Sequence, residues 1–148
     1  MKISASIDIH CRPEEVFTWI DNPDKAMRWQ NGVKGGEIIK ETPQRTGTTF
    51  MEEMEEDGKS LVMHGEITDY IPDKSISFHL ESKIHQVNVK YWVTGNPDKS
   101  ALYVESEIKW KFPMNIIAFF IGHKIKEKII QQQKSELAEL KRLCETAG

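Results

Sequence analysis

The 148-residue chain has little cysteine, no excess of positive charge and no long hydrophobic run. Its two cysteines, Cys11 and Cys144, lie near opposite ends without a CxxC pair or a histidine at metal-ligand spacing. This pattern predicts two reduced, inert thiols and indicates neither a zinc site nor a disulfide framework. Because 23 acidic residues outnumber 20 basic ones, and no basic cluster alternates with aromatic residues, we expect no nucleic-acid partner.

The most apolar stretch, residues 112–122, is about half the length that spans a bilayer, so we expect no transmembrane helix. The first ten residues alternate apolar and polar types, whereas a signal peptide needs a continuous apolar run, so a cytoplasmic protein is expected. The chain also lacks a GxGxxG motif, a phosphate-binding loop and a nucleophile elbow. We therefore expect no cofactor and no metal. The length of the chain suits one folded domain, over residues 1–148.

The spacing of apolar and polar residues along the chain predicts the strands and helices. Residues 2–9 alternate as a half-buried strand does, and two short helices follow, the first opened by Pro13 and the second capped by Asn22. Six further strands in meander order are predicted at 37–41, 48–56, 59–67, 75–80, 86–93 and 101–110, with Gly35 and Gly36 in a loop. A helix is predicted from Pro113 to about Glu145.

The hairpin around Asp57-Gly58 carries the sharpest signal. A two-residue type I′ turn there pairs Glu52 with Met63 and places Glu52 in mid-strand. That face otherwise carries Phe50, Met54, Leu61, Met63 and Ile67, while Glu56 has the same parity but lies beside the turn, within reach of Lys59 and water. An acid in such a place must be paired, hydrated or neutral. The alternative is a bulge near Gly47, which would turn Glu52 outward.

The long helix shows a stripe at three- and four-residue steps. It consists of Ile116, Phe119, His123, Lys126, Ile130, Gln133, Leu137, Leu140 and Cys144. The stripe is apolar at both ends and polar in the middle. Around Ile117 to Ile121 the helix is apolar on every side, which predicts that this section is covered from two directions or borders an opening.

The order of these elements is similar to that of the SRPBCC superfamily, the START and birch-pollen-allergen group that includes polyketide cyclase/dehydrase and lipid transport proteins. The matching segments are "ISASIDIHCRPEEVFTWIDNPDKAMRW", "TGTTF", "GEITDYIPDKSISFHL" and the tail. The resemblance implies an α+β helix-grip fold, in which a curved seven-stranded antiparallel sheet wraps around a long C-terminal helix and leaves a hydrophobic cavity. It implies no catalytic residue, because no single catalytic motif runs through this superfamily.

Alternation of faces selects the residues expected to line that cavity. They are Phe50, Glu52, Met54, Met63, Phe78, Val89, Tyr91, Ser106, Ile108 and Trp110 from the strands, and Phe119, His123, Lys126 and Ile130 from the helix. Methionines among aromatic residues suit an adaptable pocket for apolar ligands. The alternative is that the same residues simply pack together as core.

Three hypotheses for function follow. The first is binding of a small hydrophobic or amphipathic molecule, with Glu52 and either His123 or Lys126 as polar anchor. The second is an enzyme of the cyclase, dehydratase or hydrolase type that uses Glu52 as general acid or base, assisted by His123 or Tyr91. The third is a protein-interaction or stress-related module that uses the apolar start of the last helix. A homodimer is left open.

Overall fold

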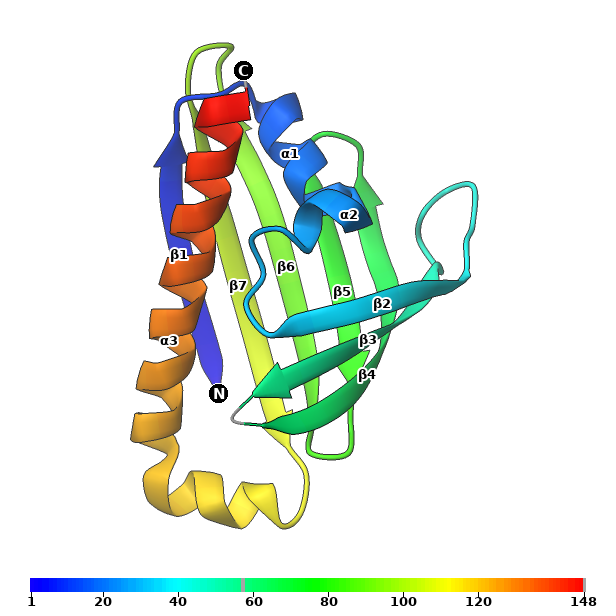
Figure 1. The fold of residues 1–148 in the computed structure, drawn as a ribbon, viewed down its shortest axis with the longest axis vertical. Coiled ribbons are helices and arrows are strands. Elements are labelled where there is room, and N and C mark those ends of the chain that lie inside the picture. The colour runs from blue at the N-terminus through cyan, green and yellow to red at the C-terminus, as the bar shows by residue number, and fades with distance from the viewer. Residues whose placement is uncertain (57, 148) are drawn as a thin grey trace.

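The computed structural model describes residues 1–56 and 58–147, and Figure 1 shows its arrangement. Asp57, on which the predicted hairpin turn depends, lies outside the described residues. The elements in chain order are β1 (Lys2–Ile9), α1 (Pro13–Asp21), α2 (Pro23–Ala26), β2 (Val33–Lys40), β3 (Thr49–Glu56), β4 (Lys59–Ile71), β5 (Ser75–Glu81), β6 (His85–Gly95), β7 (Ser100–Trp110) and α3 (Met114–Ala147).

The strands form one antiparallel sheet in the order β1-β7-β6-β5-β4-β3-β2. The sheet is curved, with α1 and α2 over one end of its concave side and α3 running beside β1 (Figure 1). This confirms the predicted α+β helix-grip fold with a meander of strands. Among the described residues, none of the helices combines the length and the hydrophobicity that crossing a bilayer requires.

The two short helices begin as their sequences predict. Pro13 occupies the first turn of α1, where its missing N–H costs nothing, and Glu14 and Glu15 follow it. The Asn22 Oδ1 atom caps α2 by accepting hydrogen bonds from the N–H groups of Asp24 (3.0 Å) and Lys25 (3.2 Å). Both helices follow β1 directly in the chain and lie over the concave side of the sheet (Figure 1).

Strand β2 corrects the prediction of a loop at Gly35 and Gly36, because the strand begins at Val33 and passes through both glycines. A Cβ atom on Gly36 would lie 2.9 Å from the Met51 carbonyl oxygen. The backbones of β2 and β3 therefore approach closely at Gly36, and the glycine permits this close contact instead of forming a turn.

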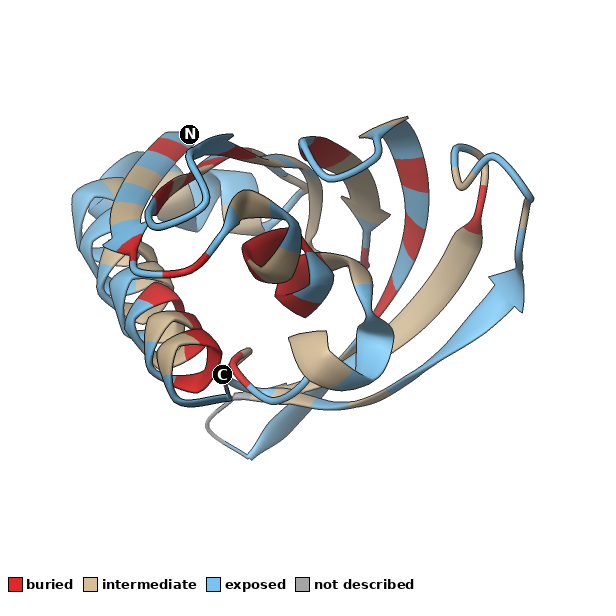
Figure 2. Ribbon diagram, turned by 90° about the horizontal axis from the view of Figure 1, so that it is seen from above, coloured by how far each residue is buried: buried red, intermediate tan, exposed pale blue. Residues whose placement is uncertain are grey.

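The core occupies the half of the molecule where α1, α2 and the end of α3 meet the sheet (Figure 2). Trp29 is almost fully buried there and donates a hydrogen bond from Nε1 to the Trp19 carbonyl oxygen, at 2.8 Å. The same cluster includes Ile9, Val16, Phe17, Ile76, Leu102, Val104, Leu137 and Leu140. The other half of the sheet is covered less completely.

Helix α3 is not the single straight helix that the sequence predicts. Ile121 has non-helical dihedral angles (φ −124°, ψ 22°) and divides α3 into a short first section and a long second one. The predicted stripe holds at its end, where Leu137, Leu140 and Cys144 are buried. It fails at its start, where Phe119 is 83% exposed, because the kink turns the first section away from the core.

Candidate functional site

A pocket of about 170 Å³ lies between the two short helices, β2 and the concave face of the sheet. Its apolar wall is formed mainly by Ile20, Met27, Phe50, Ile67, Ile76 and Phe78. Gly35 and Gly36 of β2 line it as well, where larger side chains would take up space. No described residue of α3 lines this pocket, so it is displaced from the cavity that we predicted between sheet and long helix.

Aromatic rings form one continuous part of the wall. Phe50 and Phe78 meet edge to face with ring centroids 5.8 Å apart, and Phe78 meets Tyr91 in the same way at 6.5 Å. Such pairs add to the stability that burial of the rings provides. The three residues therefore give the pocket a firm apolar side along β3, β5 and β6.

Glu52 lines this pocket from β3. The predicted pairing of Glu52 with Met63 is present, and no register shift occurs between the described residues of β3 and β4, so the bulge considered near Gly47 is absent there. No side-chain hydrogen bond or ion pair joins Glu52 to another described residue. Its partial burial raises the pKa of the carboxyl group above the ordinary value.

Glu136 of α3 is a second partly buried acid, and sequence reasoning did not single it out. It accepts a hydrogen bond from the Asn31 N–H to Oε2, at 2.8 Å. Burial raises the pKa of Glu136 to about 7, and the charge of Glu52 raises it further, while the bonds from Asn31 and Gln132 act in the opposite direction. The available signal was its position three residues after Gln133, on the edge of the predicted stripe.

Tyr91 of β6 completes this group. Burial raises the pKa of its hydroxyl group, and the negative charges of Glu136 and Glu52 raise it further. The phenol therefore stays neutral at physiological pH and is available as a hydrogen-bond donor. Elements that are distant in sequence, namely β3, β6 and α3, thus bring two carboxyl groups and one phenol within electrostatic reach of one another.

The opposite end of the pocket has a polar cluster that sequence reasoning also missed. The Arg45 guanidinium contacts the Asp21 carboxylate, and the Tyr70 hydroxyl donates to Asp21 Oδ2 at 2.8 Å. Arg45 Nε is buried without a hydrogen-bond partner among the described residues. Arg45 has a positive φ of 71° in the segment between β2 and β3, which the sequence pattern marked only as turn chemistry.

A further polar group lies between β7 and α3. Gln133 Nε2 donates to Ser106 Oγ at 3.4 Å, as expected for residues that share the space under the long helix. Gln133 Oε1 and Trp110 Nε1 are buried, and neither has a hydrogen-bond partner within the described part of the chain. One acceptor and one donor are therefore unsatisfied in the interior, which is rare in folded proteins without water or a ligand.

The structure distributes the predicted lining residues over several places. Phe50, Glu52, Phe78 and Tyr91 line the pocket. Those that are buried or partly buried outside it are Met54, Met63, Val89, Ser106, Ile108, Trp110 and Ile130. Phe119, His123 and Lys126 are exposed, because α3 packs against β1, β7 and α1 and its first half extends beyond them. The structure does not bring His123 or Lys126 together with Glu52.

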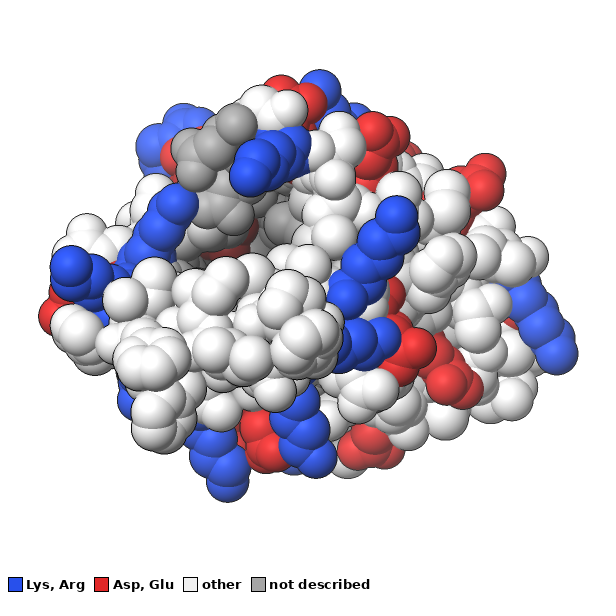
Figure 3. Space-filling view, turned by 90° about the horizontal axis from the view of Figure 1, so that it is seen from below, with Lys and Arg blue, Asp and Glu red and all other residues white. Residues whose placement is uncertain are grey.

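Seen from the end of the molecule where α3 begins, the surface has a hollow (Figure 3). Acidic atoms are visible inside this hollow, and lysine or arginine side chains stand around its edge. The sparsely covered half of the sheet thus opens to solvent beside the apolar start of α3.

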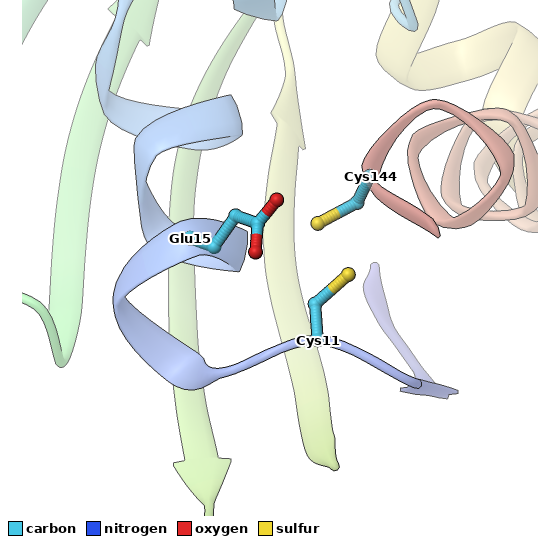
Figure 4. Close-up of side chains that lie close together, drawn as sticks. All are labelled: Cys11, Glu15 and Cys144. Carbon is cyan, nitrogen blue, oxygen red and sulfur yellow. The ribbon is translucent and has the colours of Figure 1, made fainter. Parts of the chain in front are cut away.

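The two cysteines meet although they are distant in sequence. Cys11 follows β1 and Cys144 lies near the end of α3, and their sulfur atoms and the Glu15 carboxylate of α1 lie close together (Figure 4). One sulfur or carboxylate atom from each residue lies within 4.8 Å of the others. Burial raises the pKa of the Cys144 thiol, and the neighbouring Cys11 raises it further, so the thiol form is favoured.

The chain belongs to the family described as "Polyketide cyclase / dehydrase and lipid transport", which matches residues 1–145. No curated protein matches it in sequence. Among solved structures, it is similar to a START superfamily protein from Mycobacterium smegmatis, with a TM-score of 0.83 and 15% identity over 99% of both chains.

Two further structures show the same fold. The protein TTHA0849 from Thermus thermophilus has a TM-score of 0.81 and 13% identity, covering 100% of this chain and 99% of its own. The Zhui aromatase/cyclase from Streptomyces sp. R1128 has a TM-score of 0.76 and 10% identity, covering 98% and 93%. At these identities the likeness concerns the fold alone.

Proposed function

We propose that the protein binds a small amphipathic molecule in the pocket between α1, α2, β2 and the sheet, with Glu52 as its polar contact. The observation that carries this proposal is a partly buried carboxyl group on an apolar wall, with no hydrogen bond to another described residue. Partial burial disfavours the charged form of this carboxyl group, and a hydrogen-bond donor that enters the pocket would offset that cost. A ligand with a hydroxyl or amino group beside an apolar body would supply such a donor.

The size of the pocket limits the ligand. An engineered protein cavity of about 150 Å³ accommodates benzene, and the pocket here measures about 170 Å³. The aromatic side formed by Phe50, Phe78 and Tyr91 favours a flat apolar body. We therefore expect molecules with one aromatic ring, or a short aliphatic chain, that carry a single hydroxyl or amino group.

The test has two parts. Native mass spectrometry of gently purified protein should detect a co-purifying small molecule, and thermal-shift screening with phenols, benzylamines and medium-chain alcohols should raise the melting temperature. Glu52→Gln should weaken binding by roughly tenfold, because a hydrogen bond to a charged group contributes about 1.5 kcal/mol or more. Glu53→Gln is the matched control, since Glu53 is exposed on the opposite face of β3.

Two results would reject the proposal. One is the absence of both a bound species and any thermal shift across the whole library. The other is equal binding by the wild type and Glu52→Gln, which would remove Glu52 from the site.

A second candidate, acid–base catalysis, is favoured by the presence of Glu52 and Tyr91 in the wall of one pocket. Burial raises the pKa of Glu52 and keeps the Tyr91 phenol neutral, so the pocket offers one carboxyl group and one O–H donor. In a dehydration, the Glu52 carboxylate would remove a proton beside a carbonyl group and the Tyr91 hydroxyl would protonate the departing hydroxyl, which leaves as water. Proton transfer from Glu52 to the Tyr91 phenolate then restores both groups. His123 has no part in this scheme because it is exposed.

This second candidate is tested with a one-ring β-hydroxyketone, whose dehydration to the conjugated enone is followed by ultraviolet absorbance. Glu52→Gln and Tyr91→Phe should each abolish turnover while binding of the ketone survives in at least one of them. Unchanged rates in both variants, or no turnover by the wild type, would reject catalysis and leave binding as the function.

A further inference from the structure

The first section of α3 and the short segment before it, which holds Phe112, expose a large amount of apolar surface. Phe119 is 83% exposed, Phe112 75% and Phe120 72%, and three isoleucines close to them are exposed too. We call these residues the apolar tip, which consists of Phe112, Ile116, Ile117, Phe119, Phe120 and Ile121. Large exposed patches of this kind mark interaction sites in soluble proteins.

The fold itself does not cover the apolar tip. The kink at Ile121 separates it from the second section of α3, which packs against β1, β7 and α1. The Phe119 and Phe120 rings contact each other edge to face, with centroids 5.3 Å apart, and both remain exposed. Apolar side chains point outward from several sides of this short helix, whereas a helix that docks into a protein groove needs only one apolar face.

Positive charge surrounds the apolar tip. Residues 109–128 contain five lysines and one acidic residue, Glu127, although the whole chain has a net charge of −3. Lys109, Lys124 and Lys126 are exposed. Figure 3 shows lysine or arginine side chains on several sides of the uncharged surface at this end of the molecule. The local charge is therefore opposite in sign to that of the protein as a whole.

We propose that the apolar tip docks on an anionic membrane surface. The phenylalanine and isoleucine side chains enter the boundary between headgroups and acyl chains, and the flanking lysines contact anionic headgroups. The section from Met114 to Ile121 is about 12 Å long at 1.5 Å per residue, so it lies in the interface and does not cross the bilayer. The environment at that depth covers a helix from several sides at once, which fits the distribution of its apolar residues.

Charge also argues against a second copy of this chain as the occupant. Two apolar tips in contact would bring both sets of lysines together, and like charges across an interface are unfavourable. An anionic surface instead offers each lysine about 1 kcal/mol, or roughly fivefold in affinity, at low ionic strength. The charge pattern thus selects the membrane surface over self-association.

The hollow in Figure 3 opens beside the apolar tip, so docking would place this opening close to the lipid. Docking does not depend on the ligand proposed above, because its test contains lipid and protein only. Loss of ligand binding with intact docking, or the reverse, would separate the two proposals.

The experiment is flotation of the whole chain with vesicles of phosphatidylcholine containing 30% phosphatidylglycerol, compared with pure phosphatidylcholine. We expect binding to the anionic vesicles that is at least tenfold tighter than to neutral ones and that weakens at high salt. Phe119→Ser combined with Phe120→Ser should reduce it at least tenfold. Ile71→Ser is the control for apolar exposure, since Ile71 is 48% exposed on another part of the surface.

The lysines are tested by Lys124→Ala combined with Lys126→Ala, which should weaken binding to anionic vesicles roughly 25-fold at low ionic strength. Lys40→Ala combined with Lys74→Ala removes the same charge from exposed sites on other elements and should change binding far less. Circular dichroism should show native folding for all variants, because the replaced side chains are exposed.

Three outcomes would overturn the proposal. The first is no binding to anionic vesicles, and the second is equal loss in the test and control variants. The third is a dimer in light scattering that becomes a monomer when Phe119 and Phe120 are replaced, which would assign the apolar tip to self-association.

Discussion

Glu52 on β3 and Glu136 on α3 repel each other across the interior, and this repulsion adds to the burial that raises the pKa of Glu136 to about 7. Two acids from elements about 80 positions apart in the chain therefore share one electrostatic environment. Each protonation step depends on the charge state of the other group. This dependence gives the interior a measurable response to pH.

The first prediction concerns the stability of Glu136→Gln. The pKa of Glu136 is 4.5 as an ordinary value and about 7 in the fold, so the folded state holds its proton more tightly than the unfolded state does. The stability that this tighter proton binding gives the folded state is complete below about pH 4.5 and is lost as the pH rises through 7. The free energy of unfolding of Glu136→Gln should thus exceed that of the wild type by up to about 3 kcal/mol at pH 8, and by almost nothing at pH 4.5.

Urea unfolding between pH 4.5 and 8 measures this difference. Glu127→Gln removes the same charge from an exposed position of α3 and should follow the wild-type profile in shape. A constant gap between Glu136→Gln and the wild type at every pH would show that Glu136 is not the group responsible.

The second prediction concerns the coupling of the two acids. In Glu52→Gln the repulsion disappears, so the pKa of Glu136 should fall but stay above the ordinary 4.5, because burial is the larger cause of its shift. A carbon-13 NMR titration of the glutamate carboxyl groups measures it. Glu53→Gln should leave the titration of Glu136 unchanged, and a similar response to both substitutions would contradict direct coupling between Glu52 and Glu136.

The third prediction concerns the two glycines of β2. Gly36→Ala should destabilise the fold by about 1 to 3 kcal/mol, because the new Cβ would lie 2.9 Å from the Met51 carbonyl oxygen and the backbones must move apart. Gly35→Ala meets no heavy atom within 4 Å and should be neutral or stabilising by about 0.5 kcal/mol. Paired thermal melts measure both, and equal effects would show that the close approach at Gly36 is unimportant.

The fourth prediction concerns the thiols. Cys144 is fully buried, and burial and the neighbouring Cys11 raise the pKa of its thiol, so little reactive thiolate forms at neutral pH. Both cysteines should react with an aromatic disulfide reagent at least a hundredfold more slowly in the folded protein than in urea. Stopped-flow absorbance measures the rates, with Cys11→Ser and Cys144→Ser assigning them. Rapid reaction of the native protein would contradict the buried placement.

Local patterns were enough to predict most of the fold. Alternation along the strands, Pro13 at the start of α1 and Asn22 as the cap of α2 all depend on neighbours in sequence. The pairing of Glu52 with Met63 follows from the length of one hairpin loop. Each of these features depends on a few adjacent residues, so the local sequence is enough to predict it.

The parts that sequence reasoning missed depend on how distant elements meet. Each residue turns a helix by about 100°, so Glu136 lies only about 60° around the helix from Gln133, and a small error in the docking face of α3 leaves it out of the predicted stripe. The kink at Ile121 adds to this error. Arg45 reaches the pocket from an irregular segment, and Cys11 meets Cys144 only in the folded chain. Contacts between such distant elements leave no periodic pattern in the sequence.

The sheet order has a consequence for synthesis. Strand β1 pairs with β7, so that Lys2 lies opposite Glu107, and α3 packs on β1 as well. While the chain leaves the ribosome, the first strand has no native neighbour until about a hundred further residues have emerged. Contacts between such remote positions slow folding, and we expect closure of this sheet to be a late event that leaves an unpaired strand open to chaperones in the meantime.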